Sequence, residues 1–459
     1  MNHLRQKVIF IIKIFLQSQI KERVFMTKGK KKTIKKAILI IIAVIFAVLL
    51  VAIIVSAIMN VGAKKKAIKI ATSFDAVSYE SQLVPEKDSN GYWCFTTDDD
   101  LKIMQLTDIH IGGGWMSKDK DSMSINAVAA MVTAEKPDLV IATGDISFPV
   151  PFMAGTLNNL NAAKIFASLM ETLGVYWVPI YGNHDTEAYS LYSREKISEF
   201  YGSDDLKYCL FQAGDEDVDG YGNSAILVKN SKGVITQSIF LFDSHSYTDG
   251  DYFGAMAKYD TIHENQIEWY KNLVTDFNAQ NATAIEKGYS AEEKQEALNN
   301  FGTVPSLAFY HIPSEEFKTA WDEYCDNGRQ DTENVKHIYG TAGESNKVVY
   351  CGIHPDDMFE TMLELGSTKG VFCGHDHLNN FSLEYKGIRL TYGYSIDYLA
   401  YSGISKKGSQ RGCTLITVSP DGSFTNEGSS YYQDKYPTLK GNVKEDVTMQ
   451  DLDAEAKPN

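Results

Sequence analysis

The chain has 459 residues, of which 44% are apolar and 22% are charged, a composition typical of a globular protein rather than a disordered one. Its net charge of −15 is unevenly distributed, because residues 1–66 contain 14 Lys and Arg residues and a single acid. The other 393 residues therefore carry a net charge of −28. So acidic a body lacks the basic surface that neutralises phosphates in nucleic-acid complexes, and we expect no nucleic-acid partner.

Residues 37–59 form an uncharged stretch rich in Ile, Val, Ala and Leu. A helix needs about 20 apolar residues to cross a bilayer, so we predict one transmembrane anchor here. The basic segment 1–36 holds more Lys and Arg than the residues just after the stretch, which predicts a cytoplasmic N-terminal segment and an extracytoplasmic catalytic body. A cleaved signal peptide is the alternative, since the small residues at 55–57 and 61–63 resemble cleavage sites.

We divide the rest of the chain into a linker over 60–90, a folded domain over 91–433 and a polar tail over 434–459. Within the domain, short apolar runs alternate with segments of helical spacing, which is typical of an α/β sheet. The first two runs, 92–97 and 101–107, are expected to pair as a hairpin around the polar turn between them.

Side chains that can bind metals follow five of these apolar runs. Asp108 and His110 follow the run 101–107 at i and i+2, a spacing that an extended backbone points to one side. The later runs end at Asp145, at Asn183 and His184, at His311, and at His375 and His377. Each residue alone is better explained as a turn former or a strand-end donor, so the hypothesis depends on the set. Nitrogen and oxygen donors without thiolate favour Mn, Fe or Zn over a Cys-rich structural site.

The order Asp-x-His, Gly-Asp, Gly-Asn-His-Asp, His, Gly-His-x-His resembles the calcineurin-like metallophosphoesterases over about residues 101–424. The phrases QLTDIHIG, HENQIEWY, FYHIP and DMFETMLELGSTKGVFCGHDH look most like the branch of small purple-acid-phosphatase-like proteins and a cell-cycle phosphoprotein phosphatase. This resemblance implies a four-layer α/β/β/α sandwich with two divalent metal ions between its sheets. It also implies hydrolysis of a phosphoester by a metal-activated hydroxide.

The resemblance assigns each predicted ligand to one of the two metals. Asp108, His110 and His377 bind the first metal, Asn183, His311 and His375 bind the second, and Asp145 bridges them. It further implies that His184 donates a proton to the leaving group and that Asp185 orients the His184 ring, although His184 as a spectator beside the site is an alternative. Asp376, between two ligands, is expected to point away from the metals.

Two positions depart from the purple acid phosphatases, which have a metal-bound tyrosine three residues after the Gly-Asp aspartate. This chain has Phe148 there, and it has His110 where those enzymes have glycine. We therefore expect neither a purple charge-transfer colour nor a requirement for ferric iron. His245 and an aromatic loop are candidates for the wall of a substrate pocket, the loop contributing Tyr392, Tyr394, Tyr398 and Tyr401.

These expectations together describe a membrane-anchored phosphatase that hydrolyses phosphomonoesters of small molecules or phosphoproteins. Two alternatives stay open at this stage. One is a phosphodiesterase that acts on nucleotides or lipid headgroups. The other is a non-catalytic surface binding protein that retains a phosphatase scaffold.

Overall fold

A computed structural model of the chain describes residues 28–248, 250–345, 348–401, 404, 411–430 and 436. The chain divides into two compact units, Met1–Ile58 and Met59–Asn459. Most of the predicted cytoplasmic segment 1–36, and all of the predicted tail 434–459 except Tyr436, lie outside the described residues.

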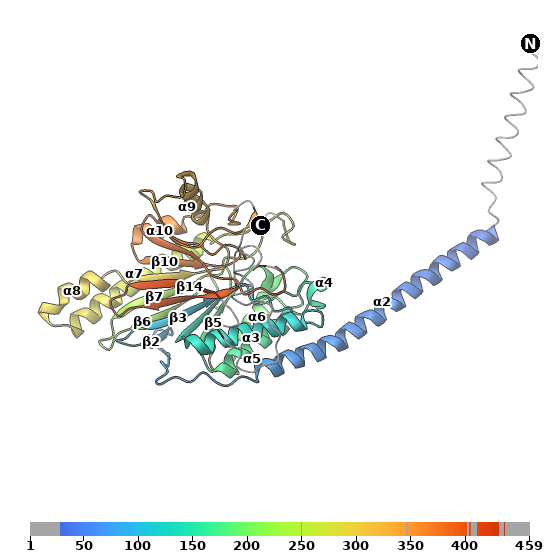
Figure 1. Cartoon of the computed structure of the whole chain (residues 1–459), viewed down its shortest axis with the longest axis horizontal. Helices are drawn as coiled ribbons and strands as arrows, with labels where there is room; N and C mark the ends of the chain where they lie inside the picture. Colours follow the sequence, from blue (N-terminus) through green and yellow to red (C-terminus); the bar gives the residue numbers. More distant parts are fainter. Residues whose placement is uncertain are drawn as a thin grey trace, which may run out of the picture. The chain divides into compact units, whose positions relative to one another are not determined.

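The first unit contains most of α2 (Lys28–Ala71), whose apolar part is the predicted span (Figure 1). Residues Lys35–Ala71 are long and apolar enough to cross a membrane, and none of their most apolar window is buried. An anchor and a signal sequence both have this composition near an N-terminus. The helix also continues through residues 60–71, where we expected a linker, because Ala67 and Ala71 are buried in the core of the second unit.

Two mixed β-sheets form the centre of the second unit (Figure 1). The larger sheet has nine strands, in the order β1 (Glu86–Lys87), β2 (Trp93–Thr96), β6 (Ser224–Lys229), β7 (Ile235–Leu241), β8 (Ser306–Phe309), β10 (Thr368–Cys373), β12 (Ile388–Tyr392), β11 (Ser382–Tyr385) and β9 (Val335–Tyr339). The smaller sheet has five, in the order β14 (Phe424–Ser430), β13 (Gly412–Val418), β3 (Leu101–Leu106), β4 (Leu139–Thr143) and β5 (Trp177–Ile180).

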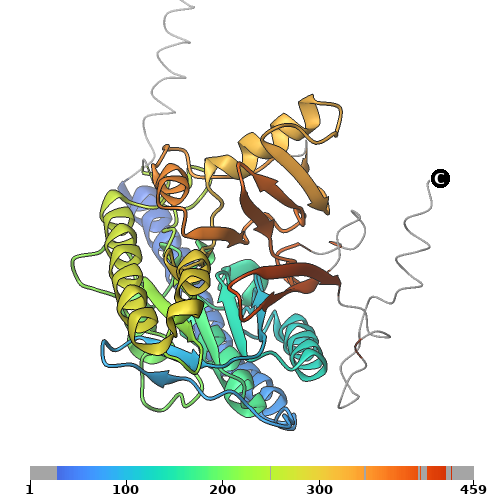
Figure 2. The same cartoon turned by 90° about the vertical axis from the view of Figure 1, so that its left-hand side faces the viewer.

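Helices cover the outer face of each sheet. The smaller sheet packs against α3 (Lys118–Glu135) and α5 (Asn159–Leu173), and the larger sheet packs against α7 (Glu264–Gly288), α9 (Glu315–Asp326) and α10 (Met358–Leu365). Figure 2 shows in yellow how α8 (Ala291–Phe301) lies beside α7. Three short helical segments lie in the loops of the smaller sheet, namely α4 (Pro151–Ala154), the 3-10 helix η1 (His184–Thr186) and α6 (Arg194–Tyr201).

The alternation of side chains along each strand builds the layers. In β3, Leu101 and Ile103 are buried between the two sheets, whereas Met104 and Leu106 pack with the residues of α3 and α5. Because both faces of each sheet are covered in this way, the inner strands β4, β7 and β8 are buried along their whole length. The expected four-layer α/β/β/α sandwich is thereby confirmed.

The predicted hairpin of 92–97 and 101–107 was wrong. β2 pairs in parallel with β6 in the larger sheet, and β3 pairs with β4 and β13 in the smaller one. Phe95 and Ile103 nevertheless meet in the layer between the sheets. Burial in this shared core therefore decides the pairing of these strands, and the short turn between them only carries the chain from one sheet to the other.

Candidate metal centre

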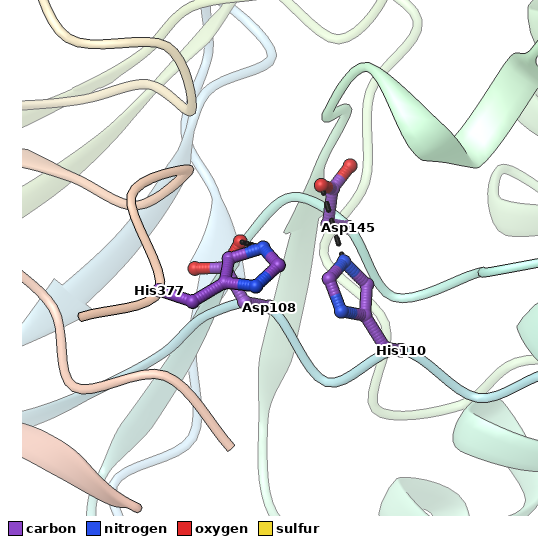
Figure 3. A group of neighbouring side chains, drawn as sticks. All are labelled: Asp108, His110, Asp145 and His377. Carbon is purple, nitrogen blue, oxygen red and sulfur yellow. Dashed lines mark hydrogen bonds and ion pairs between the residues drawn. The ribbon is translucent and has the colours of Figure 1, made fainter. Parts of the chain in front are cut away.

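The predicted ligands converge beyond the carboxyl ends of five strands, β3, β4 and β5 of one sheet and β8 and β10 of the other. Asp108, His110, Asp145 and His377 form a first group, in which the potential donor atoms all lie within 4.8 Å of one another (Figure 3). The Nε2 atom of His377 lies 3.4 Å from Oδ1 of Asp108. This group brings together all the residues assigned to the first metal, together with the predicted bridge.

A second group contains Asp145, His311 and His375, again with donor atoms within 4.8 Å of one another. Asp145 belongs to both groups, and a single oxygen joins them. Its Oδ2 atom lies 3.3 Å from Nε2 of His110 and 3.2 Å from Nε2 of His311. Asn183 completes the second group, since its Oδ1 atom lies 3.2 Å from the same His311 nitrogen.

The backbone at the ligands is left-handed rather than extended. Asp108, His110, Asp145 and His375 have φ values of 49°, 51°, 52° and 77°. Our expectation that an extended strand points Asp108 and His110 to one side was therefore wrong, because β3 ends at Leu106 and the loop turns the side chains inward. Non-glycine residues in this region cost about 1–3 kcal/mol and cluster at functional sites.

Two close approaches explain the glycines that precede the ligands. A side-chain carbon on Gly144 would lie 2.6 Å from the His311 ring, and one on Gly182 would lie 2.2 Å from Oδ1 of Asp145. Gly144 also has a φ of 87°, which favours glycine. The Gly-Asp and Gly-Asn motifs thus let two loops pack directly on the ligands.

The burial, hydrogen bonding and pKa of the predicted ligands suit the binding of cations. Oδ1 of Asp108 and Nδ1 of His375 are buried and have no hydrogen-bond partner among the described residues. Nδ1 of His311 lies 2.8 Å from the carbonyl oxygen of Thr143, which leaves Nε2 for a metal. Burial and the nearby His311 lower the pKa of His375, which favours the neutral form that binds metals. Burial alone would raise the pKa of Asp145, but His311 and His184 hold it well below its ordinary value.

Asp397 is a residue of the site that the sequence did not indicate. Its two oxygens each lie 3.1 Å from a ligand, Oδ1 from Nδ1 of His110 and Oδ2 from Nδ1 of His377. The carboxylate is fully buried and accepts the backbone N–H groups of Leu399, Ala400 and Tyr401. Asp397 therefore positions both histidines of the first group so that their Nε2 atoms face the site.

His184 lies at the edge of the centre, and its backbone N–H donates to Oδ1 of Asp145 over 2.8 Å. Its ring is oriented by Glu187, because Nδ1 lies 2.6 Å from Oε1 of that residue. The prediction that Asp185 orients the ring was wrong. The Asp185 carboxylate is buried and accepts the backbone N–H groups of Asp145, Ser147 and Gly182, so it fixes the two ligand loops to each other.

A hydroxyl group links Glu187 to a ligand. The hydroxyl of Tyr247 donates to Oε1 of Glu187 over 3.0 Å and accepts from Nδ2 of Asn183 over 2.8 Å. The second contact fixes the amide of Asn183 with its oxygen toward His311. Glu187 follows His184 at i+3 on a helical turn, so its spacing was the signal that could have identified it.

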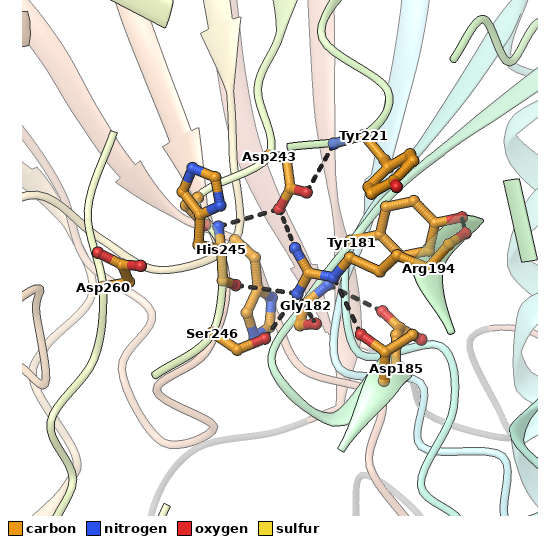
Figure 4. A network of polar contacts seen from close by, with 12 residues as sticks. Tyr181, Gly182, Asp185, Arg194, Tyr221, Asp243, His245, Ser246 and Asp260 are labelled. Atoms are coloured by element: carbon orange, nitrogen blue, oxygen red, sulfur yellow. Dashed lines mark hydrogen bonds and ion pairs between the residues drawn. The ribbon is translucent and has the colours of Figure 1, made fainter. Parts of the chain in front are cut away.

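The partly buried side chain of Arg194 holds the loop that contains His245 and Ser246 (Figure 4). Arg194 pairs with Asp243, and its guanidinium also donates to the carbonyl oxygens of Gly182 and His245 over 3.0 and 3.1 Å. His245 itself does not join the wall of the pocket, because its ring stacks on His263 at 3.9 Å. The network connects the Gly-Asn-His-Asp loop to the loop after β7.

Phe148 and the aromatic loop complete the surroundings. The Phe148 ring packs against His110 at 4.8 Å and against His184 at 4.9 Å, so an apolar ring stands where the related enzymes have a tyrosine. Of the four tyrosines of the aromatic loop, Tyr401 lines the cavity beside the centre. The hydroxyl of Tyr392 instead donates a hydrogen bond to Oδ2 of Asp376 over 2.6 Å. This bond ties the Asp376 carboxylate to a buried tyrosine of β12.

A four-layer sandwich that presents a carboxylate shared by two groups of imidazoles at its strand ends defines a metallophosphoesterase. The chain belongs to the calcineurin-like phosphoesterase family, which matches residues 101–379. It is 30% identical to "Probable inactive purple acid phosphatase 14" of Arabidopsis thaliana over 68% of this chain and 74% of that protein. It is also 26% identical to "Phosphatase DCR2" of Saccharomyces cerevisiae over 63% of this chain and 46% of that protein.

Among solved structures, a dimetal phosphatase from Danio rerio is similar with a TM-score of 0.41 and 11% identity. That match covers 72% of this chain and 97% of that one.

Proposed function

We propose that this chain is a membrane-anchored phosphomonoesterase with two divalent metal ions of the Mn, Fe or Zn type. The observation that carries the proposal is the position of Asp145 Oδ2, within 3.3 Å of Nε2 of His110 and 3.2 Å of Nε2 of His311. One carboxylate oxygen between two groups of nitrogen and oxygen donors is the arrangement that a bridging ligand requires. In this proposal Asp108, His110 and His377 hold one metal and Asn183, His311 and His375 hold the other, which the two groups of neighbouring donor atoms support.

Two bound cations would lower the pKa of a water molecule and neutralise the charge of the phosphoryl oxygens. The chain's own residues supply the rest of the reaction. Glu187 engages Nδ1 of His184, which leaves Nε2 for the leaving oxygen, and in its imidazolium form the ring can donate a proton from Nε2 to that oxygen. Phe148 packs on the His184 ring and restricts its orientation. Asp185 acts through the backbone and takes no part in proton transfer.

The location follows from the apolar part of α2. As an uncleaved anchor, residues 37–59 would tether the catalytic unit to a membrane, and the Lys-rich segment before them would keep the N-terminus in the cytoplasm. Substrates would then be phosphomonoesters of small molecules or phosphoproteins outside the cytoplasm. A signal sequence would give the same compartment without the tether.

A non-catalytic binding protein is a second candidate, because a relative carries the word "inactive" in its name. The donor set argues against this candidate here. Every predicted ligand is present, and the centre also retains His184, its partner Glu187 and the positioning residue Asp397. A scaffold used only for binding has no need of an oriented proton donor.

The test compares hydrolysis of an aryl phosphate with that of a bis-aryl phosphate by the full chain in detergent, after chelation and reloading with Mn or Zn. We expect turnover of the monoester that requires metal and exceeds turnover of the diester. Greater turnover of the diester would instead favour a phosphodiesterase. If the chain binds two metals and hydrolyses neither substrate, the second candidate would be supported.

A further inference from the structure

A cavity of about 240 Å³ opens beside the metal centre. His375 and His377 line it on one side, and His184 lies at its edge. The rest of the wall contains three tyrosines, two carboxyl groups and a serine, namely Tyr259, Tyr350, Tyr401, Glu344, Asp376 and Ser345. Because the proton donor and two ligands share this cavity, the alcohol part of a substrate would occupy it. Its volume is below the range of about 300–1,000 Å³ that holds drug-sized ligands, so this alcohol is small.

Glu344 is a buried carboxylate, and no cationic side chain in the described part of the chain pairs with it. Glu344 is only 7% exposed. No Lys, Arg or His among the described residues forms an ion pair with it. Oε1 accepts the backbone N–H of Leu378 over 3.1 Å, and Oε2 accepts the hydroxyl of Tyr401 over 3.2 Å. An ionised carboxylate has about four acceptor sites, so each oxygen can accept a further hydrogen bond or face a cation. Buried glutamates are rare unless they are paired.

Aromatic rings stand around this carboxylate. The Tyr259 ring lies 4.2 Å from the His375 ring at an angle of 81°, and the Tyr401 ring lies 5.2 Å from the His377 ring at 79°. Tyr350, which is 38% exposed, adds a third ring to the lining. The faces of aromatic rings attract cations, and cages of such rings recognise ammonium groups. No Lys or Arg is found among the described residues that line the cavity.

We propose that this cavity binds an ammonium group on the leaving alcohol, so that the substrate is the phosphoester of a small amino alcohol such as choline. The proposal rests on the proposed phosphoesterase function and names its substrate class. In the reaction, a water oxygen forms a bond to phosphorus, and the bond between phosphorus and the alcohol oxygen breaks. The products are inorganic phosphate and the amino alcohol, whose oxygen takes a proton from His184.

The test uses a matched pair of substrates. Phosphocholine and 3,3-dimethylbutyl phosphate have nearly the same shape, and they differ by the replacement of the charged nitrogen with carbon. We expect the metal-loaded full chain to prefer phosphocholine by about tenfold or more in kcat/KM, in line with a cation held by rings and a carboxylate. Equal turnover of the two substrates would overturn the proposal and leave the phosphoesterase function standing. Turnover of neither, nor of an aryl phosphate, would overturn the phosphoesterase function itself.

Two variants test the residues that carry the preference. Glu344→Gln keeps one of the two acceptor oxygens and removes the negative charge, so the ratio of the two kcat/KM values should fall toward one. Tyr350→Leu removes a half-exposed ring and should lower the same ratio even if the glutamate variant does not fold. Glu384→Gln is the matched control, because this glutamate pairs with Lys336 on a strand remote from the cavity. If the ratio of the two kcat/KM values stays at the wild-type value in both cavity variants, these residues do not set the preference. Glu344 would then only hold Tyr401 in place, and the proposal would be overturned.

A third arm identifies the source of the amino alcohol. Vesicles of phosphatidylcholine present the same headgroup as a diester, whereas free phosphocholine presents it as a monoester. If choline is released from free phosphocholine but not from the vesicles, the result supports the proposal with a soluble substrate. Faster release from the vesicles would mean that the cavity takes the choline group of a lipid diester, and it would overturn the phosphomonoester as the substrate.

Discussion

Replacing Asp397 with asparagine is expected to weaken binding of the first metal ion and to spare the second. The Asp397 carboxylate lies 3.1 Å from Nδ1 of His110 and 3.1 Å from Nδ1 of His377, and both histidines belong to the first group of ligands. Burial alone would raise the pKa of Asp397, but His110 holds it well below its ordinary value, so the group is an anion. Asparagine has one oxygen and no charge, and it can no longer serve both rings.

The expected loss can be estimated from similar residues that support metal ligands. Their replacement typically lowers metal affinity by about 10–100-fold, which corresponds to about 1.4–2.7 kcal/mol. Because Asp397 contacts two ligands of the same ion, we expect a loss near the upper end for that ion. No described contact joins Asp397 to His311 or His375, so the second ion should be retained at wild-type affinity.

The assay is a chelator titration of the metal-loaded full chain, which follows the release of each equivalent of metal. Asp376→Asn is the matched control, since Asp376 is also a buried carboxylate next to His377 in the chain but accepts hydrogen bonds from Tyr392 and Asn379. Circular dichroism would check that both variants are folded. Equal release curves for wild type and Asp397→Asn, or a larger loss in the Asp376 variant, would refute the positioning role.

Four further outcomes are expected. His184→Ala should lower kcat for the aryl phosphate by about 10²–10⁴-fold without changing the metal content, and an unchanged kcat would remove His184 from the mechanism. Asp185→Ala should lower the free energy of unfolding by about 3 kcal/mol or more, since it leaves three buried N–H groups without acceptors, and a denaturant titration measures this. Phe148→Tyr should produce a visible tyrosinate band with ferric iron that the wild type lacks; a band in the wild type would contradict our assignment. The hydrogen bond to Asp260 raises the pKa of His263 to about 9, so the stability that His263→Gln removes should be greatest below pH 6.5 and should vanish as the pH rises through 9.

The layers of the fold and the ligands of the site could be predicted because short stretches of sequence mark them. Apolar runs that end in Asp145, His311 or His375 place these side chains at strand ends, and the carboxyl ends of parallel strands meet at one edge. The pairing of β2 and β3 could not be predicted in the same way. Both strands have residues that suit a buried face, and only the assembled core decides which sheet each strand joins.

The supporting residues were missed for a related reason. Asp397 belongs to none of the motifs and follows none of the apolar runs that the sequence marks, and its role exists only because the loop after β12 folds back on His110 and His377. Asp185 was assigned to the His184 ring because it is adjacent in sequence. The left-handed turn at the ligands directs it instead to the backbone N–H groups of Asp145, Ser147 and Gly182.

The central claim is that Asp145 joins two metal ions. Anomalous diffraction from crystals of the chain loaded with Mn or Zn tests it most directly. We predict two peaks per chain about 3.5–4 Å apart, one beside His110 and His377, the other beside His311 and His375, with an oxygen of Asp145 between them. A single peak, or two peaks that do not share Asp145, would contradict the account.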